Sequence, residues 1–406
     1  METVAPEKVG FSSNKLNRIG AWMRGYVEQD KLAGAVAVAV RHGQVAYRER
    51  FGLMDREAAR PMQFDTIFRI YSMTKPVASV ALMMLYEEGR FQLTDPVSRF
   101  IPGFANLMAF VAATKRGMII VDDLEREMTI QHLLTHTAGL AYGLSADSPI
   151  EALYHEAGIF DSGPLHIMQV TLPEMIQRLV ELPLAHQPGS AWRYSQATDV
   201  LGYLVEVISG MSLDAFFEEK IFKPLGMEDT GFYVPEEKLD RLAALYGPEE
   251  GCGVQLLEAP ATSSFARPTR CLSGGIGLVS TASDYARFAQ MLLNGGELEG
   301  ARLLGRKTVE LMTMNHLPRE LVPIQMGAHT LHGCGFGLGF RVRVDAARSG
   351  MLGSEGEYGW GGYASTSFFV DPRENLVGLL LTQLAPSRHY PIRNEFKVLV
   401  YQALVD

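Results

Sequence analysis

The tetrad Ser72-Met73-Thr74-Lys75 pairs a hydroxyl group with an amine three residues apart. On a helix, residues at this spacing lie on the same face, one turn from each other. A serine hydroxyl becomes an effective nucleophile only when a neighbouring base accepts its proton. A lysine can be that base only where its surroundings lower its pKa. The tetrad therefore predicts a nucleophile at Ser72, with Lys75 taking part in proton transfer.

A second S-x-x-K match, from Ser12 to Lys15, has a different context. Ser12 opens a polar terminal segment, where a serine is typical of a helix N-cap. Ser72 precedes Pro76, which suits only the first turn of a helix. We therefore expect a helix to begin beside Ser72, so that its hydroxyl lies in the field of a helix N-terminus, which favours negative charge. On the tetrad alone, a plain N-cap remains the alternative for Ser72.

Further motifs accompany the tetrad in a fixed order. They are 68–71 (FRIY), 93–97 (LTDPV), 132–140 (HLLTHTAGL), 188–195 (PGSAWRYS), 274–281 (GGIGLVST) and 360–362 (WGG). Their order and spacing resemble the serine β-lactamase-like superfamily, which has the class C β-lactamase and penicillin-binding-protein fold. The closest resemblance is to the carboxylesterases of family VIII, and it covers nearly the whole chain. No serine stands in G-x-S-x-G, so the nucleophile elbow of α/β-hydrolases is missing.

The resemblance implies catalytic roles for three residues. Ser72 matches the family nucleophile, Lys75 its amine, and Tyr194 the tyrosine of the second family motif, Y-x-N. The third position of that motif is Gln196, which keeps an amide on a longer arm, so its contact with substrate is in doubt. Which of Lys75 and Tyr194 is the acylation base stays open. A Ser-His pair using His136 is disfavoured, because family members keep this segment as helix and loop.

Trp360-Gly361-Gly362 stands where the lactamases carry K-T-G, and the family esterases often carry W-G-G there. Glycines let the backbone pass close to a substrate. The resemblance assigns the oxyanion donors to the backbone N–H groups of Ser72 and Tyr363. A lysine at 360 would attract the carboxylate of a β-lactam or a peptide end, whereas tryptophan offers apolar area that suits an alkyl or aryl ester. Plain core packing is the alternative for Trp360.

The expected function is therefore a carboxylesterase that hydrolyses short-chain esters by double displacement, with no metal and no organic cofactor. Three alternatives stay open. One is a β-lactamase or D,D-peptidase on the same fold, and another is an acyltransferase, in which an alcohol replaces water as the acceptor. The third is a non-catalytic binding protein, which the intact Ser72, Lys75 and Tyr194 disfavour.

Strand patterns occur at both ends of the chain and helical patterns dominate the middle. Residues 35–40 and 44–51 predict a hairpin around His42-Gly43, and 340–344, 365–370 and 376–382 predict strands before a C-terminal helix. We therefore expect an α/β fold: one antiparallel sheet built from both chain ends, flanked by helices, with an inserted helical lobe. The predicted boundaries are 1–80 and 186–406 for the α/β sandwich domain and 81–185 for the helical lobe.

The composition restricts the partners. The chain has 406 residues and a net charge of −9, and nucleic-acid binding needs a basic surface, so no nucleic-acid partner is expected. No apolar run approaches the ~20 residues that span a membrane, and no signal peptide is visible. Cys252, Cys271 and Cys334 are an odd number of cysteines without metal-ligand spacing. We therefore expect a cytoplasmic protein with three free thiols and a small-molecule ester substrate, while the oligomeric state stays open.

Overall fold

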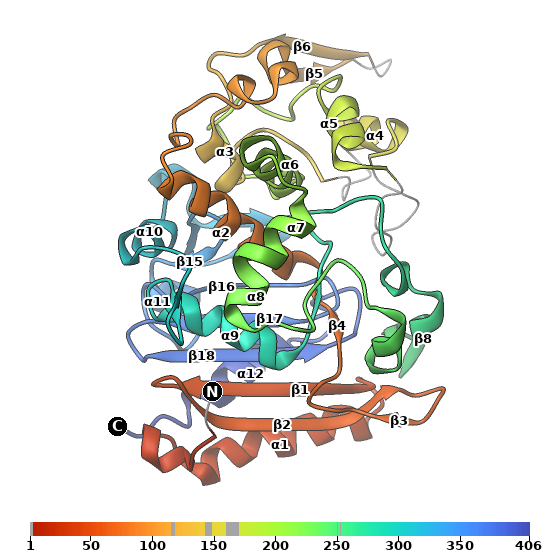
Figure 1. Ribbon diagram of the computed structural model, residues 1–406, viewed down its shortest axis with the longest axis vertical. Coiled ribbons are helices and arrows are strands. Elements are labelled where there is room, and N and C mark those ends of the chain that lie inside the picture. Colours follow the sequence, from red (N-terminus) through yellow and green to blue (C-terminus); the bar gives the residue numbers. More distant parts are fainter. Residues whose placement is uncertain (1–2, 115–117, 143–147, 160–169, 250, 252) are drawn as a thin grey trace.

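The computed structural model describes residues 3–114, 118–142, 148–159, 170–249, 251 and 253–406 (Figure 1). Its largest sheet is antiparallel, with the strand order β14-β15-β16-β17-β18-β1-β2-β3. The strands are β1 (Gly34–Arg41), β2 (Gln44–Asp55), β3 (Arg60–Pro61), β14 (Cys334–Phe336), β15 (Arg341–Arg343), β16 (Tyr358–Gly361), β17 (Ser367–Asp371) and β18 (Leu376–Thr382). Because β1 pairs with β18, the two ends of the chain meet in the middle of one sheet, which confirms the expected fold class.

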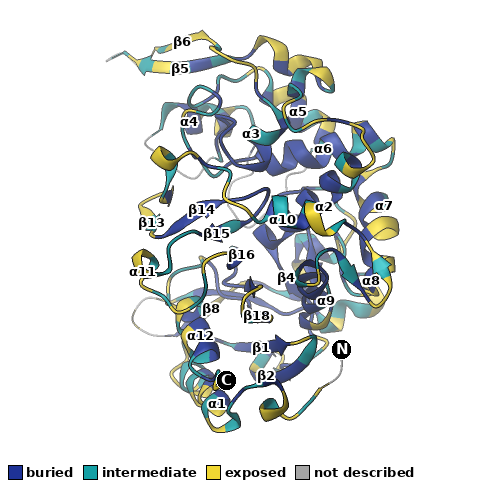
Figure 2. Ribbon diagram, turned by 90° about the vertical axis from the view of Figure 1, so that its left-hand side faces the viewer, coloured by how far each residue is buried: buried dark blue, intermediate teal, exposed yellow. Residues whose placement is uncertain are grey.

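The two faces of this sheet carry separate apolar cores. Along β1, Val36, Val38 and Val40 belong to one core and the alternating alanines to the other, as the two-residue period of a strand requires. The alanine face packs on α1 (Ser13–Glu28) and α12 (Ile392–Tyr401). The valine face packs on α9 (Ala282–Leu293). Figure 2 shows β1 fully buried between these layers.

The upper part of the molecule in Figure 1 is largely helical. It contains α3 (Ile130–Leu134), α4 (Pro149–Glu156), α5 (Leu172–Leu179), α6 (Ala197–Ser209) and the hairpin of β5 (Met108–Ala113) and β6 (Ile119–Asp123). The remaining helices, α2 (Thr74–Glu87), α7 (Leu213–Phe217), α8 (Lys223–Leu225), α9 (Ala282–Leu293), α10 (Arg306–Met312) and α11 (Ala346–Ser349), surround the sheet. The domain boundaries at 81 and 185 remain a prediction.

The expected helix cap at Ser12 is confirmed. Ser12 is the N-cap of α1, and its side chain accepts from the Lys15 N–H. The S-x-x-K match from Ser12 to Lys15 is therefore a helix cap. Thr281 caps α9 by accepting from the Asp284 N–H. The β5–β6 hairpin and the strand β16 are departures from the expectation. β16 is only four residues long, and two of these are glycines, which rarely occupy strands.

Two of the three cysteines can be placed. Cys271 and Cys334 are buried and unpaired, while Cys252 lies outside the described residues. We expect thiol titration of the denatured, unreduced protein to find three free thiols. Finding only one would show that two of the cysteines are joined by a disulfide.

Within the described ranges, no single helix is long and apolar enough to cross a membrane. A bent pair of helices, Ala197–Ser209 with Leu213–Leu225, meets the criteria by length and composition alone.

Candidate active site

Ser72 lies in the 3-10 turn Tyr71–Met73, between the short strand β4 (Phe68–Arg69) and α2. The α-helix begins at Thr74, two residues after Ser72, so Ser72 lies in the turn that precedes the helix. The serine side chain is not a cap of this helix, since the N-cap is Met73 and no side chain bonds there. In the part of the chain that the structure describes, the Ser72 hydroxyl makes no hydrogen bond, so it is free to meet a substrate.

The backbone around the serine is tightly held. The Tyr285 hydroxyl donates to the Met73 carbonyl at 2.8 Å, and the Ile70 N–H donates to the Leu278 carbonyl at 3.1 Å. Tyr71, directly before the serine, has a φ of 42°. A non-glycine residue in this region costs about 1–3 kcal/mol and persists only where the surrounding structure imposes it. The packing therefore forces the turn that presents Ser72.

Lys75 is 2% exposed in the first turn of α2. Its Nζ donates to the Gly275 carbonyl at 2.9 Å and to the Tyr142 hydroxyl at 3.4 Å. It also lies 4.7 Å from the centre of the Tyr194 ring. Burial alone lowers the pKa of Lys75, but Tyr142, Tyr194 and the Asp199 carboxylate together raise it above the ordinary value. This direction is opposite to the lowered pKa that a lysine base requires.

Tyr194 connects Lys75 to the W-G-G strand. Its ring stacks on Tyr142 at 5.0 Å, and its hydroxyl accepts from Trp360 Nε1 at 3.3 Å. Tyr142, which the sequence reasoning missed, therefore holds both Lys75 and Tyr194. The sequence signal that could have pointed to Tyr142 is its position two residues after Leu140, the last residue of the HLLTHTAGL motif.

Trp360 is only 8% exposed and packs on Phe336 and Tyr194. It offers less apolar surface to a substrate than the sequence suggested. The strand β16 pairs with β17 at Trp360 and Gly361, whereas β15 reaches only Tyr358 and Gly359. Among the described residues, no strand pairs with the other edge of Trp360-Gly361. A Cβ at Gly362 would lie 2.3 Å from the Ile70 carbonyl oxygen, so a glycine is required where this strand crosses the segment before Ser72.

The backbone N–H groups of Ser72 and Tyr363 are the expected oxyanion donors. Neither N–H donates to another group within the described ranges. The two residues come from segments that touch, because Gly362 lies against Ile70 and the rings of Tyr71 and Tyr363 meet at 6.0 Å. This leaves both donors available to a substrate oxygen.

Gln196 and His136 are less available. Gln196 is 5% exposed, and its N–H donates to the Ala141 carbonyl at 3.0 Å, so little of it can touch a substrate. His136 Nδ1 is 3.2 Å from the Ser195 hydroxyl, and burial holds the pKa of its ring well below the ordinary value. His136 is thus a neutral packing residue bonded to Ser195, which agrees with its exclusion as the partner of Ser72.

A buried carboxylate behind Lys75 was also missed. Asp199 accepts from the Ser273 hydroxyl at 2.5 Å and from the Gly275 N–H at 3.1 Å. Because Gly275 presents its carbonyl to Lys75, Asp199 fixes the loop that holds the amine. Burial raises the pKa of Asp199, and Lys75 opposes this rise.

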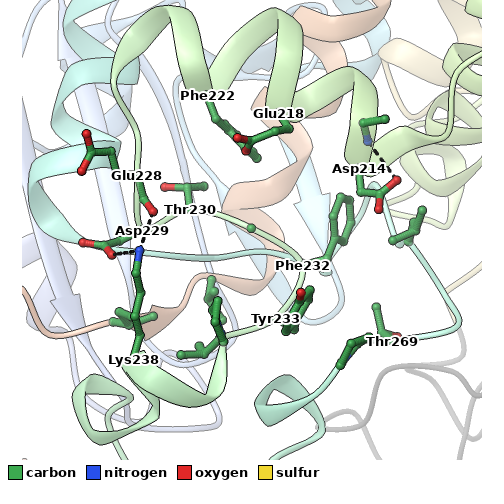
Figure 3. Close-up of a pocket in the computed structure, with 18 residues that line it drawn as sticks. Asp214, Glu218, Phe222, Glu228, Asp229, Thr230, Phe232, Tyr233, Lys238 and Thr269 are labelled. Atoms are coloured by element: carbon green, nitrogen blue, oxygen red, sulfur yellow. Dashed lines mark hydrogen bonds and ion pairs between the residues drawn. The ribbon is translucent and has the colours of Figure 1, made fainter.

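A separate surface pocket, with a volume of about 410 Å³, lies beside α7 and α8 (Figure 3). Asp214 and Glu218 stand on its rim, and Lys238 pairs with Asp229 at 2.8 Å. None of the candidate catalytic residues lines it, so we place the chemistry at Ser72 instead.

A sequence profile of the family described as Beta-lactamase matches residues 19–402. The chain belongs to the β-lactamase family. It is 35% identical over 390 residues to "Esterase EstB" of Burkholderia gladioli, covering 91% of this chain and 90% of that one. It is 36% identical over 370 residues to "Protein Rv1367c" of Mycobacterium tuberculosis, covering 90% and 89%.

Among solved structures, the chain resembles "EstCE1, a hydrolase with promiscuous acyltransferase activity", with a TM-score of 0.80 and 28% identity. The likeness covers 97% of this chain and 99% of that one. This β-lactamase-family protein is therefore a serine hydrolase on the fold of its esterase relatives.

Proposed function

We propose that this β-lactamase-family protein is a carboxylesterase that hydrolyses short-chain esters through an acyl-enzyme on Ser72. The observation that carries the proposal is the hydrogen bond from Trp360 Nε1 to the Tyr194 hydroxyl. It places an uncharged donor where the lactamases carry a lysine. The identity to Esterase EstB supports the same choice.

The proposed reaction is a double displacement. The Ser72 oxygen attacks the ester carbonyl carbon while its proton passes to the deprotonated oxygen of Tyr194, and the oxyanion accepts from the N–H groups of Ser72 and Tyr363. When the oxyanion collapses, the ester C–O bond breaks and the alcohol leaves with the proton from Tyr194. Water then attacks the acyl carbon, gives its proton to the same relay, and releases the acid and free Ser72.

Lys75 and Tyr194 divide the proton transfer in this scheme. A lysine that stays charged cannot accept the proton of Ser72 directly. Its cation instead lies 4.7 Å from the centre of the Tyr194 ring. We therefore assign Tyr194 as the acylation base and Lys75 as the cation that supports it.

The test of the substrate class compares p-nitrophenyl butyrate with benzylpenicillin. A penicillin brings a carboxylate, whose burial without a partner costs several kcal/mol, and Trp360 supplies no cation. Arg393 and Arg388 lie within electrostatic reach of Tyr194, but Arg393 already donates to the Gly362 carbonyl. At ~1.4 kcal/mol per tenfold, we expect kcat/KM for the ester to exceed that for benzylpenicillin by about 100-fold or more.

Values of kcat/KM within tenfold of each other would overturn the esterase assignment in favour of a β-lactamase. Nitrocefin is unsuitable for the comparison, because its reactive ring opens even in modest sites.

Acyl transfer is the second candidate, favoured by the likeness to EstCE1. It shares every step up to the acyl-enzyme and differs only in whether an alcohol or water attacks. The same Ser72 intermediate therefore serves both outcomes.

A further inference from the structure

Arg393 lies directly against the W-G-G strand. It is the second residue of α12, and its Nη2 donates to the Gly362 carbonyl. A Cβ at Gly361 would lie 2.8 Å from Cζ of this guanidinium. The same Cβ would lie 2.9 Å from the Thr366 carbonyl oxygen, so the arginine and the neighbouring strand both approach Gly361 closely.

The charge of Arg393 has no counterion in the described part of the chain. No carboxylate there lies within ion-pair distance of it, and its Nε is buried without a partner. Burial, with help from Arg388, lowers the pKa of Arg393 to about 9. Arg393 is therefore a partly buried cation without a counterion beside the candidate active site, an arrangement that points to a functional role.

A second contact between the same two elements fixes this arrangement. Lys397, one turn after Arg393 on α12, pairs at 2.5 Å with Glu357, the residue before β16. Burial opposes the ionisation of Glu357, but Lys397, Arg341 and Arg343 lower its pKa to about 2. The Lys397–Glu357 pair therefore fixes α12 beside one end of β16, and Arg393 contacts the glycines at the other end.

We propose that Arg393 is a positioning residue that orients and polarises the oxyanion donor of Tyr363, an inference that rests on the proposed function. The Gly362 carbonyl and the Tyr363 N–H belong to one planar peptide group. A guanidinium on the oxygen fixes the direction of the N–H at the other end of that plane. It also draws electron density from the group, which strengthens the N–H as a donor. The peptide group thereby transmits the attraction of the Arg393 cation to the negative charge that develops on the substrate oxygen.

The test uses Arg393→Met, which removes the charge, and Arg393→Lys, which keeps it. Loss of one whole oxyanion donor costs about 10²–10³ in kcat, so we expect Arg393→Met to lower kcat for p-nitrophenyl butyrate by about 10- to 100-fold. KM should change by no more than about twofold, and Arg393→Lys should restore part of kcat. Arg373→Met, which removes an arginine whose side chain is 64% exposed, is the matched control and should stay within about threefold of the wild type.

A trifluoromethyl ketone separates this role from simple structural damage. It adds to a serine to form a charged hemiketal, so Arg393→Met should raise its inhibition constant by the same factor by which kcat falls. An unchanged inhibition constant would overturn the proposal. So would a loss confined to mono-p-nitrophenyl glutarate, because Arg393 would then be binding a substrate carboxylate.

The rate at which an ester phosphonate labels Ser72 gives a readout that does not need turnover. Slower labelling of Arg393→Met supports the proposal even if p-nitrophenyl butyrate is a poor substrate, and equal labelling rates contradict it. If the wild type is not labelled at all, the proposed function fails, and this inference fails with it.

Discussion

Ser72→Ala is expected to abolish nearly all ester turnover, lowering kcat by about 10³-fold or more, as the loss of a nucleophile does in other serine enzymes. The substitution removes the only oxygen that can form the acyl-enzyme in this scheme. Folding should be unaffected, because the Ser72 side chain caps no helix and makes no hydrogen bond within the described residues. Steady-state hydrolysis of p-nitrophenyl butyrate, with thermal unfolding measured alongside, checks both parts.

Ser12→Ala is the matched control, since it removes the serine of the other S-x-x-K match. It loses a helix N-cap, so it should lower the free energy of unfolding by about 1 kcal/mol and leave turnover intact. A Ser72→Ala protein with turnover close to that of the wild type would rule out Ser72 as the nucleophile.

The second large effect concerns the proton relay. Lys75→Ala and Tyr194→Phe should each lower kcat by about 10²–10⁴-fold, the range for loss of a general acid–base. The double variant should be little worse than the worse single variant, because residues that act as one unit are not additive. Tyr203→Phe, on the neighbouring helix α6, is the control for removal of a phenol. Defects that multiply in the double variant would show that the two residues act independently.

The pH profile distinguishes the two roles. Since the pKa of Lys75 is raised, its protonated form persists as the pH rises through the ordinary lysine value of 10.5. With Lys75 as a required cation, kcat/KM should fall once the pH is high enough to deprotonate the amine, above that value. If Lys75 were the base, kcat/KM would instead stay high after the amine had lost its proton.

The fold was predictable where the sequence carries long regular patterns. β1 and β18 are unbroken apolar strands, and α12 has an apolar stripe at helical spacing, so the meeting of the two chain ends could be expected. β16 could not be found by such patterns, because a four-residue strand with two glycines has no strand propensity. Only the resemblance to known families drew attention to it.

The candidate catalytic residues were predictable because they stand in sequence motifs. Ser72, Lys75 and Tyr194 stand in recognisable motifs, and the structure places Lys75 against Tyr194 and Tyr194 against Trp360. The contacts of Asp199 and Arg393 with glycine loops are tertiary, and no local sequence pattern predicts such contacts. The pKa of Lys75 could not be predicted from the sequence either, because it depends on the balance between burial, which lowers it, and three neighbouring groups, which raise it.

The central claim, that Ser72 forms a covalent intermediate, is tested most directly by the intact-protein mass after mixing with a small ester phosphonate. We predict a single adduct that peptide mapping places on Ser72, and none on the Ser72→Ala protein. No adduct on the wild type, or an adduct on a different serine, would contradict the account.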